Sequence, residues 1–473
     1  MLLSVCAAWT LAQAAPPDLK ARLDRVLAPL VAEADITPGV RLEALDGTLL
    51  YERRGAEPFV IASNMKLFTT AAALLALGPE YRWSSTGILD GSRLWLLGNG
   101  DPSLRRIGER DVPAAFLDGL AKALRARGVP ALSEAVLDGR AFSGPARHPL
   151  WPEDQWQADY CAPVSALALE GGCLEILESG GSLRAYPSAG SAWRWERKSA
   201  SDAKSWTANW NGARDAIVVR GSGAGKAPLR LAVADPAPVC AGCIEEGLRA
   251  RGIQPGAVRY AAAGETPPDG TPLIVLKSAW TLAEALTVCN KESDNYIAEV
   301  LLRTLGRERG GAGSNEAGLA AVRKVLGAAK LDLSSLSQAD GSGLARSATA
   351  RVNTSSPALL CQVLRLMAGP AGDRGGIGRV FDASLPVGGV DEKLRELFDE
   401  RLFQPGRVRA KTGWIRGASS LAGYLTVPDG TVLCFAIVVN YTSDGTARTN
   451  NARFRQAQKD LLAEVLRAWP ATN

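Results

Sequence analysis

Ser63 and Lys66 have the residue types and the spacing that acyl transfer requires. They open an apolar run, 67–77, whose alanines and leucines are strong helix formers and which ends at Gly78-Pro79. Residues three apart share a helix face, so the hydroxyl and the amine lie side by side. Backbone N–H groups at a helix N-terminus can stabilise an oxyanion, and a lysine desolvated on an apolar helix can act as base. We therefore predict Ser63 as nucleophile and Lys66 as its base.

The S-x-x-K pattern alone is weak evidence, because Ser201 and Lys204 match it as well. The surroundings separate the two matches. Only Ser63 begins an apolar helix, whereas Ser201 lies among tryptophans and polar residues that are typical of a loop or an edge strand.

Two further motifs follow in the chain. Ser293-Asp294-Asn295 forms a polar patch within 282–305, a segment that is otherwise predicted to be one helix. Such residues are poor helix formers, so the patch is either a solvated helix junction or a functional site. Lys411-Thr412-Gly413 ends a predicted strand, 406–413, where the missing side chain of Gly413 lets another extended backbone approach.

The three motifs are stronger together than apart. The order S-x-x-K, S-x-N, K-T-G occurs in class A β-lactamases and penicillin-binding proteins. Acyl transfer from an amide needs a nucleophile with a base, a proton path to the leaving amine and a cation for the substrate carboxylate. In this scheme Ser293 relays the proton, Asn295 holds the substrate amide, and Lys411 with Thr412 binds the carboxylate.

Composition narrows the classes of protein and of functional site that the chain can belong to. The chain has 473 residues, 47% of them apolar and 22% charged, which suits a globular protein of two or three domains. A net charge of +5 without a basic, aromatic-rich block argues against nucleic acid, and no apolar run is long enough to cross a bilayer. The single histidine, His148, excludes a two-histidine metal site, and no G-x-S-x-G motif supports a histidine triad. We predict no metal and no cofactor.

The first 15 residues resemble a secretory signal peptide, because an apolar stretch ends in Ala12-Gln13-Ala14, although no Lys or Arg precedes Lys20. Export makes disulfides feasible. Cys161 and Cys173 flank a short loop-to-strand passage and are the predicted pair, with Cys240 and Cys243 next in order.

The segment 147–161 crowds aromatic and acidic residues into one loop-like stretch. It either binds a ligand that carries an amine or staples a long loop. The other predicted elements are hairpins over 40–54 and 83–97, helices over 112–127, 239–251 and 452–469, a strand at 135–137, four short strands within 168–234, and strands at 421–427 and 432–440.

The motifs, together with the stretches 100–104, 162–167, 340–344 and 385–391, resemble the class C low-molecular-mass penicillin-binding proteins, the D-alanyl-D-alanine carboxypeptidase/endopeptidase type. Ser293 lies 230 residues after Ser63, which leaves room for inserted domains. The resemblance implies an α/β (α+β) fold: a β-lactamase/transpeptidase-like domain with an antiparallel sheet flanked by helices, interrupted by two nested domains. The implied boundaries are 16–84 with 270–473 for the catalytic domain, 85–167 with 235–269 for the second, and 168–234 for the third, all-β domain.

The resemblance also implies an exported, periplasmic, penicillin-sensitive enzyme without a transmembrane anchor that acts on peptidoglycan stem peptides, is acylated by β-lactam antibiotics, and can associate peripherally with the wall or membrane. Trp414 replaces the small hydroxyl residue usual after K-T-G; its N–H still suits an oxyanion hole, while its ring narrows the cleft. For the carboxylate that meets the substrate amine we choose Asp154 over Glu153 and Asp159. A serine β-lactamase and a non-catalytic penicillin sensor or wall scaffold are the alternatives.

Overall fold

The computed structural model describes residues 15–188, 193–199, 205–347, 349–368, 376–398, 401–442 and 447–470. These residues form two compact units. The first comprises the chain up to Ala76, Leu286–Asp294 and the chain from Val322 onward; the second comprises Leu77–Ala285 and Asn295–Ala321. Residues 1–14 of the predicted signal peptide and the alternative pair Ser201 and Lys204 lie outside the described residues. The finer division into three domains stays a prediction.

The first unit is built on a five-stranded antiparallel sheet with the strand order β18-β19-β20-β1-β2. The predicted hairpin around Asp46-Gly47 is confirmed by β1 and β2. Because helices cover both faces of the sheet, β19 and β20 are buried at nearly every position instead of every second one. The strands are β1 (Ile36–Ala44), β2 (Leu49–Arg53), β18 (Val408–Ile415), β19 (Ala418–Thr426) and β20 (Val432–Tyr441).

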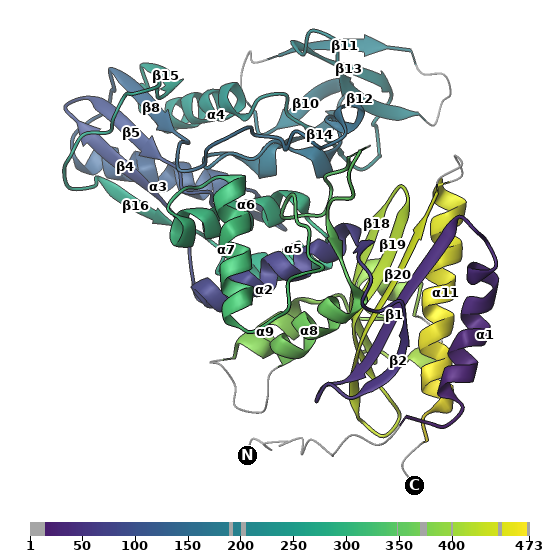
Figure 1. Cartoon of the computed structure of the whole chain (residues 1–473). Coiled ribbons are helices and arrows are strands. Elements are labelled where there is room, and N and C mark those ends of the chain that lie inside the picture. Colours follow the sequence, from purple (N-terminus) through teal and green to yellow (C-terminus); the bar gives the residue numbers. More distant parts are fainter. Residues whose placement is uncertain are drawn as a thin grey trace, which may run out of the picture. The chain divides into compact units, whose positions relative to one another are not determined.

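Two helices from the ends of the chain pack against one face of this sheet, and a third lies on the other face (Figure 1). The first two are α1 (Leu19–Val31) and α11 (Ala447–Ala468), whose apolar sides join the sheet in one core. The third is α8 (Pro357–Ala368). Shorter elements complete the unit: β3 (Phe59–Val60), β17 (Thr354–Ser355), α9 (Ile377–Ser384), α10 (Glu392–Arg395) and the 3₁₀ turn η5 (Arg401–Phe403).

The predicted apolar helix is α2 (Met65–Leu77), and it follows a short 3₁₀ turn, η1 (Ala62–Asn64). Its first ten residues are all buried, which explains why almost no polar residue interrupts the run. Ser63 therefore lies in the tight turn that leads into α2, two residues before the first residue of the α-helix itself.

The single helix predicted over 282–305 is wrong. The segment forms α5 (Leu282–Lys291) and α6 (Asn295–Gly310), with a break between them. Ser293 at the break has φ 60, a left-handed conformation that cannot continue a right-handed helix. Farther along, the chain returns to the first unit within α7 (Asn315–Ala328), at Val322.

The second unit contains a mixed five-stranded sheet, with the order β15-β8-β5-β4-β16, and two three-stranded sheets, β10-β9-β14 and β11-β13-β12. One hydrophobic core unites these sheets with α3 and α4. The predictions missed β11, which is polar and largely exposed, and β12, which is a short strand of five residues. The larger elements are β4 (Ser84–Asp90), β5 (Arg93–Leu97), α3 (Val112–Ala126), β8 (Glu134–Asp138), α4 (Pro236–Ala250), β15 (Ala257–Tyr260) and β16 (Ile274–Lys277).

The region between β8 and α4 holds the smaller sheets, and its four predicted strands are confirmed as β9, β10, β13 and β14. The strands are β9 (Cys173–Ser179), β10 (Ser182–Tyr186), β11 (Arg194–Lys198), β12 (Trp206–Trp210), β13 (Ala216–Gly221) and β14 (Leu229–Ala232); the remaining elements of the unit are β6 (Arg106–Ile107), β7 (Arg110–Asp111) and the 3₁₀ turns η2 (Glu153–Gln155), η3 (Asp159–Cys161) and η4 (Glu170–Gly172).

The predicted disulfide between Cys161 and Cys173 is wrong for this structure, in which both are buried thiols that are not bonded to each other. Cys173 instead directs its sulfur towards the carbonyl oxygen of Asp159, at 3.9 Å. Cys240 and Cys243 are also buried thiols, because they lie on the inner side of α4.

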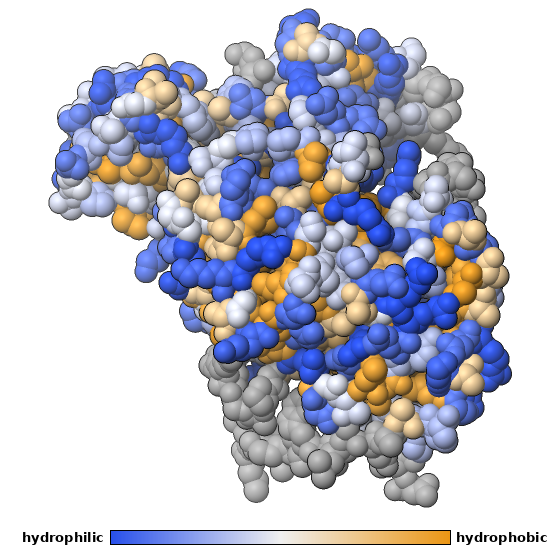
Figure 2. All heavy atoms as spheres, viewed as in Figure 1, coloured by the Kyte–Doolittle hydropathy of each residue, from blue (hydrophilic) through white to orange (hydrophobic). Residues whose placement is uncertain are grey.

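The face of the molecule shown in Figure 2 carries mainly hydrophilic residues, with the hydrophobic ones in small groups. Within the described ranges, no helix has both the length and the apolar character needed to cross a bilayer.

Candidate active site

The turn η1 presents the hydroxyl of Ser63 while it buries the residues on both sides. Ser63 is half-buried, whereas Ala62 and Lys66 have no exposed surface. The Lys66 Nζ lies 3.1 Å from Ser63 Oγ and 3.0 Å from the carbonyl oxygen of Ser342. Ala62 has φ 48, an uncommon conformation for a residue with a side chain, directly before the serine. An amine at this distance, when neutral, can accept the hydroxyl proton.

The loop 340–345 packs directly on this turn and on α2. Thr69 donates to the carbonyl oxygen of Gly341 at 2.9 Å, next to the contact between Lys66 and Ser342. Gly343 has φ 84, and a Cβ added there would lie 1.9 Å from the carbonyl oxygen of Ala62. The loop backbone therefore approaches the serine turn more closely than any residue with a side chain would allow.

A buried carboxylate holds this loop in shape. Asp340 has no exposed surface and accepts the backbone N–H groups of Gly343 and Ala345, both at 2.7 Å, and the amide of Asn353 at 3.0 Å. The sequence alone assigns no role to the stretch 340–344 beyond its part in the family resemblance. Its signal was an aspartate followed by two glycines in an otherwise polar stretch, which is typical of a tight, carboxylate-capped loop.

The second predicted pair, Ser293 and Lys411, is also brought together in the first unit. The Lys411 Nζ donates to Ser293 Oγ at 2.8 Å and to the carbonyl oxygen of Thr412 at 3.0 Å. Lys411 has no exposed surface, and burial, followed by the positive charge of Lys66, lowers the pKa of its ammonium well below the usual range. A positive charge on one of these amines therefore disfavours a positive charge on the other.

Side-chain contacts fix the chain on the N-terminal side of Ser293 to the segment 384–391. Lys291 forms an ion pair with Asp391 at 2.8 Å, and Asp391 also accepts the backbone N–H of Val387 at 2.8 Å. Asn290 donates to Ser384 at 2.8 Å. These bonds explain why the left-handed backbone conformation of Ser293 is tolerated at this position.

The strand β18 lies at the edge of its sheet, so one row of its backbone groups faces away from β19. The segment around Val387 covers the first half of that row: Gly388 donates to Val408 at 2.8 Å and Ala410 to Pro386 at 2.9 Å. Alternation along the strand places the N–H of Trp414 on the same edge as that of Ala410. The ring of Trp414 is 45% exposed.

The expectation for Gly413 needs a correction. The space that its side chain would occupy does not receive another extended backbone. A Cβ there would lie 2.3 Å from Ser420 Oγ and 2.6 Å from the carbonyl oxygen of Ile61, so the protein itself fills this space. The glycine allows β18 to pack against the turn that carries Ser63, whose backbone nitrogen would be 3.1 Å from the same Cβ.

Two predicted site residues, Asn295 and Asp154, belong to the second unit. Asn295 begins α6 and donates its amide to the carbonyl oxygen of Tyr160 at 2.9 Å. Asp154 lies in η2 and is exposed. In the same stretch Trp151 is buried, which supports the interpretation of 147–161 as a stapled loop.

Asn64, which follows the candidate nucleophile, was not predicted. It has no exposed surface, and neither polar atom of its amide has a hydrogen-bond partner among the described residues. Buried amides are normally bonded, because desolvation without a partner costs roughly 1–3 kcal/mol. Its position between Ser63 and Met65 was the only signal in the sequence.

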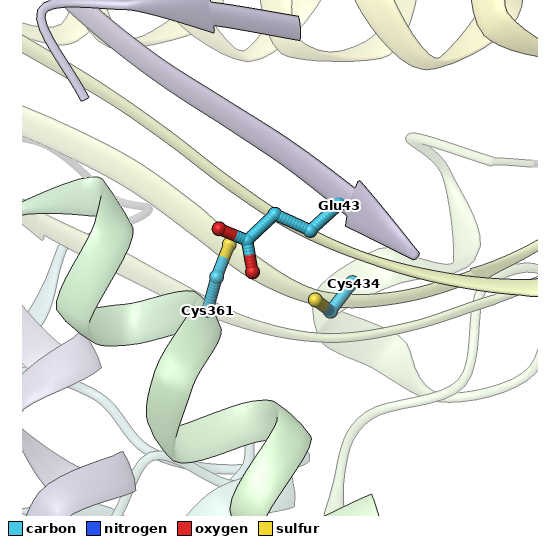
Figure 3. A group of neighbouring side chains, drawn as sticks. All are labelled: Glu43, Cys361 and Cys434. Atoms are coloured by element: carbon cyan, nitrogen blue, oxygen red, sulfur yellow. The ribbon is translucent and has the colours of Figure 1, made fainter. Parts of the chain in front are cut away.

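A second polar cluster lies on the α8 side of the sheet and joins Glu43 on β1, Cys361 on α8 and Cys434 on β20 (Figure 3). Its three ligand atoms are close enough for a metal ion, but two guanidinium groups already neutralise the carboxylate. The Nε of Arg41 lies 2.5 Å from one oxygen, and that of Arg365 lies 2.9 Å from the other at an angle that misses a hydrogen bond. Burial raises the pKa of the Cys361 thiol, so the cluster disfavours a cation.

Comparison with known proteins agrees with the architecture, which is that of low-molecular-mass penicillin-binding serine peptidases. The structure shares its fold with penicillin binding protein 4 from Haemophilus influenzae, with TM-score 0.76, 23% identity and coverage of 94% of this chain and 99% of that one. Residues 19–461 match the model of the D-Ala-D-Ala carboxypeptidase 3 (S13) family, and the chain belongs to that family.

Relatives in sequence agree. The D-alanyl-D-alanine carboxypeptidase of Actinomadura sp. (strain R39) is 30% identical, over 89% of this chain and 81% of the relative. Carboxypeptidase DacB of Mycolicibacterium smegmatis is 28% identical, over 96% and 85%. The chain is accordingly a serine-type D-Ala-D-Ala carboxypeptidase, a hydrolase, as its motifs predicted.

Replacing Gly343 with alanine tests the packing of the loop 340–345 on the serine turn. The added Cβ would meet the carbonyl oxygen of Ala62 at 1.9 Å, so the loop and the turn must separate. We expect a loss of stability of roughly 1–3 kcal/mol or more and at least a tenfold slower acylation by benzylpenicillin. Thermal unfolding and stopped-flow acylation measure the two effects.

Gly430→Ala is the matched control, because Gly430 has a similar φ of 87 but nothing within 4 Å of its added Cβ. It carries the backbone penalty without the clash. If both variants lose acylation rate equally, close packing at Ala62 is not what positions the serine.

The orphaned amide of Asn64 gives a stability prediction. Asn64→Leu replaces an unbonded polar group with an apolar one of similar size, so we expect the free energy of unfolding to stay within about 1 kcal/mol or to rise. Asn440→Leu is the contrast, because Asn440 bonds both backbone groups of Val60 at 2.9 Å and should cost several times more. Equal losses in urea unfolding would mean that Asn64 has a bonding partner in solution.

Proposed function

We propose that this chain cleaves the terminal D-Ala-D-Ala bond of peptidoglycan stem peptides, and the related bond in cross-links, through an acyl-enzyme on Ser63. The observation that carries the proposal is the contact of 3.1 Å between Lys66 Nζ and Ser63 Oγ in a chain of the carboxypeptidase family. Both bonds join the carboxyl group of one D-alanine to an amine, so one nucleophile serves both.

In the acylation step, Ser63 Oγ attacks the carbonyl carbon while neutral Lys66 takes the hydroxyl proton. The developing oxyanion accepts hydrogen bonds from the backbone N–H groups of Ser63 and Trp414. Ser293 passes a proton to the leaving amine, which departs as free D-alanine or as the other half of the cross-link. Water then attacks the ester, its proton returns through the same amine and hydroxyl groups, and Ser63 is regenerated.

Lys411 has two candidate roles. As a cation at the end of β18, with Thr412 beside it, it can bind the substrate carboxylate. Its complete burial and its bond of 2.8 Å to Ser293 favour a second role, in which it sets the proton affinity of Ser293 and, through its charge, of Lys66. The two roles predict different responses to removal of the substrate carboxylate.

The remaining substrate contacts rest on the sequence. Asn295, two residues after Ser293, holds the substrate amide; Gly413 and Trp414 border the edge of β18; and Asp154 meets the free amine of the stem. β-Lactam antibiotics enter as covalent inhibitors, because their strained amide acylates the same serine. The apolar start of the chain supports export to the periplasm, with peripheral association to wall or membrane.

The proposed activity is tested with a stem pentapeptide and a cross-linked muropeptide dimer. We expect the purified chain to release D-alanine from the first and to split the second, and Ser63→Ala to do neither. Activity that persists in Ser63→Ala would refute the proposal. Rapid turnover of penicillin without peptide cleavage would instead indicate a serine β-lactamase, and a chain that binds penicillin without forming a covalent adduct would be a sensor or scaffold.

Replacement of Lys66 and replacement of Lys411 should have different effects on the acylation rate. Lys66→Ala removes proton abstraction, which is worth roughly 10²–10⁴-fold in rate, for every substrate. If Lys411 binds the carboxylate, Lys411→Ala should slow a thioester substrate with a free carboxylate by roughly ten- to a hundredfold and its methyl ester much less. Acylation rates measured with the acid and with its methyl ester show whether Lys411 binds the carboxylate. Equal slowing of the acid and the ester would assign Lys411 to proton affinity alone.

The lowered pKa of Lys411 predicts a pH dependence. Burial, then the charge of Lys66, disfavours the ammonium, so Lys411 is charged only below a pKa well under the usual value of about 10.4. Carboxylate binding is therefore present at lower pH and lost as pH rises through that pKa. The ratio of acylation rates for the acid and its methyl ester should fall accordingly. A ratio that stays constant up to about pH 10 would contradict this.

A further inference from the structure

A cavity of about 220 Å³ opens in the second unit, between the loop that carries η2 and the turn from β12 to β13. It has no part in the chemistry assigned to Ser63. The cavity is lined by Arg147, Glu153, Trp156, Gln157, Trp210 and Arg214, with small residues between them.

Two guanidinium groups lie over one indole in this cavity. The guanidinium carbon of Arg147 is 5.4 Å from the centre of the Trp156 ring, and that of Arg214 is 5.6 Å from it. Neither arginine forms an ion pair with a carboxylate of the described residues. Their charges are therefore balanced only by more distant groups, which favours an anion in the cavity that both arginines line.

Arg147 is held in place by neutral acceptors. Its side chain donates to the carbonyl oxygens of Cys161 at 2.9 Å, Ala234 at 2.9 Å and Val233 at 2.5 Å. Burial, then the charge of Arg214, lowers the pKa of Arg147 to about 10, which leaves the guanidinium charged at neutral pH. Four of its five N–H groups are used, counting a longer bond to Trp156, so its role is to fix a positive charge in the cavity wall.

Arg214 supplies the adaptable contact. It is exposed, and it is held on the turn between β12 and β13 with φ 58, a conformation that favours residues other than arginine. An uncommon backbone conformation at a residue that faces a binding cavity is typical of a functional position.

The two tryptophans that line the cavity are held differently. The indole nitrogen of Trp156 is buried and has no acceptor among the described residues. In contrast, the indole of Trp210 donates to the carbonyl oxygen of Ala232 at 2.8 Å, and its backbone N–H donates to Gln157 at 2.6 Å. Trp210 thus forms a rigid apolar wall of the cavity.

We propose that this cavity binds the carboxylate of an acidic residue in a peptidoglycan peptide, away from the scissile bond. The claim rests on the proposed function for the identity of the polymer. A short aliphatic carboxylate matches the chemistry of the lining: two cations for the anion, and the indole rings with two alanines for the methylene groups. Glu153 at the rim leaves one net positive charge, which suits a single carboxylate.

The test uses the full chain carrying Ser63→Ala, labelled with ¹⁵N at tryptophan, and a stem tripeptide that lacks D-Ala-D-Ala. The indole signal lost in Trp156→Phe identifies Trp156. We expect that signal to move on titration with the free-acid tripeptide and to stay in place with its fully amidated form. No movement, or equal movement with both peptides, would overturn the proposal.

Arg214→Gln should weaken tripeptide binding by roughly five- to tenfold in calorimetry, and Arg214→Lys by less. Arg220→Gln is the control: it is also exposed, lies on β13 and does not line the cavity. Equal losses in Arg214→Gln and Arg220→Gln would indicate general charge attraction and reject the site. Inorganic phosphate that displaces the tripeptide and binds more tightly would also reject a peptide carboxylate as the ligand.

The experiment separates this site from the activity at Ser63. Penicillin acylation of the Arg214→Gln variant that retains Ser63 should match that of the unmodified chain, since the cavity lies outside the acylation machinery. If the unmodified chain binds the tripeptide but does not cleave stem peptides, the proposed function is refuted. If it cleaves stem peptides but does not bind the tripeptide at the cavity, the cavity proposal is refuted.

Discussion

The structure depends on two lysine amines buried in one unit. Lys66 and Lys411 have no exposed surface, and each lies within hydrogen-bond distance of a serine hydroxyl. Burial and the charge of Lys66 lower the pKa of Lys411, so the pair resists carrying two charges, and a neutral amine can act as a base. An unburied lysine pair would stay protonated at neutral pH, and both serines would remain ordinary alcohols.

The amines of Lys66 and Lys411 stay buried only if the elements packed around them are held in fixed positions, and the structure shows how this is done. The apolar helix α2 buries Lys66 from one side, and the loop around Asp340 offers it a carbonyl from the other. Gly343 and Gly413 let backbone segments approach the serine turn where side chains would collide. The unusual backbone at Ala62 and Ser293 is tolerated because neighbouring bonds hold both positions.

Much of this frame could be predicted from the sequence. A run of strong helix formers and Asp-Gly turns predicted α2 and the hairpins, and the motifs predicted two serine–lysine pairs, Ser63 with Lys66 and Ser293 with Lys411, that lie within hydrogen-bond distance in the structure. Long-range effects were missed. The break at Ser293 depends on contacts with residues about one hundred positions away, and the role of Asp340 depends on which backbone groups its loop folds around it. β11 is rich in charged residues and lacks the alternation that reveals a half-buried strand, and β12 alternates only over five residues.

The central claim is that Ser63, activated by Lys66, carries the acyl group. The most direct measurement is intact mass and peptide mapping after incubation with benzylpenicillin. The account predicts one added penicilloyl group, located on Ser63, that forms far more slowly in Lys66→Ala. An adduct on any other residue, or one that forms at the normal rate without Lys66, would contradict it.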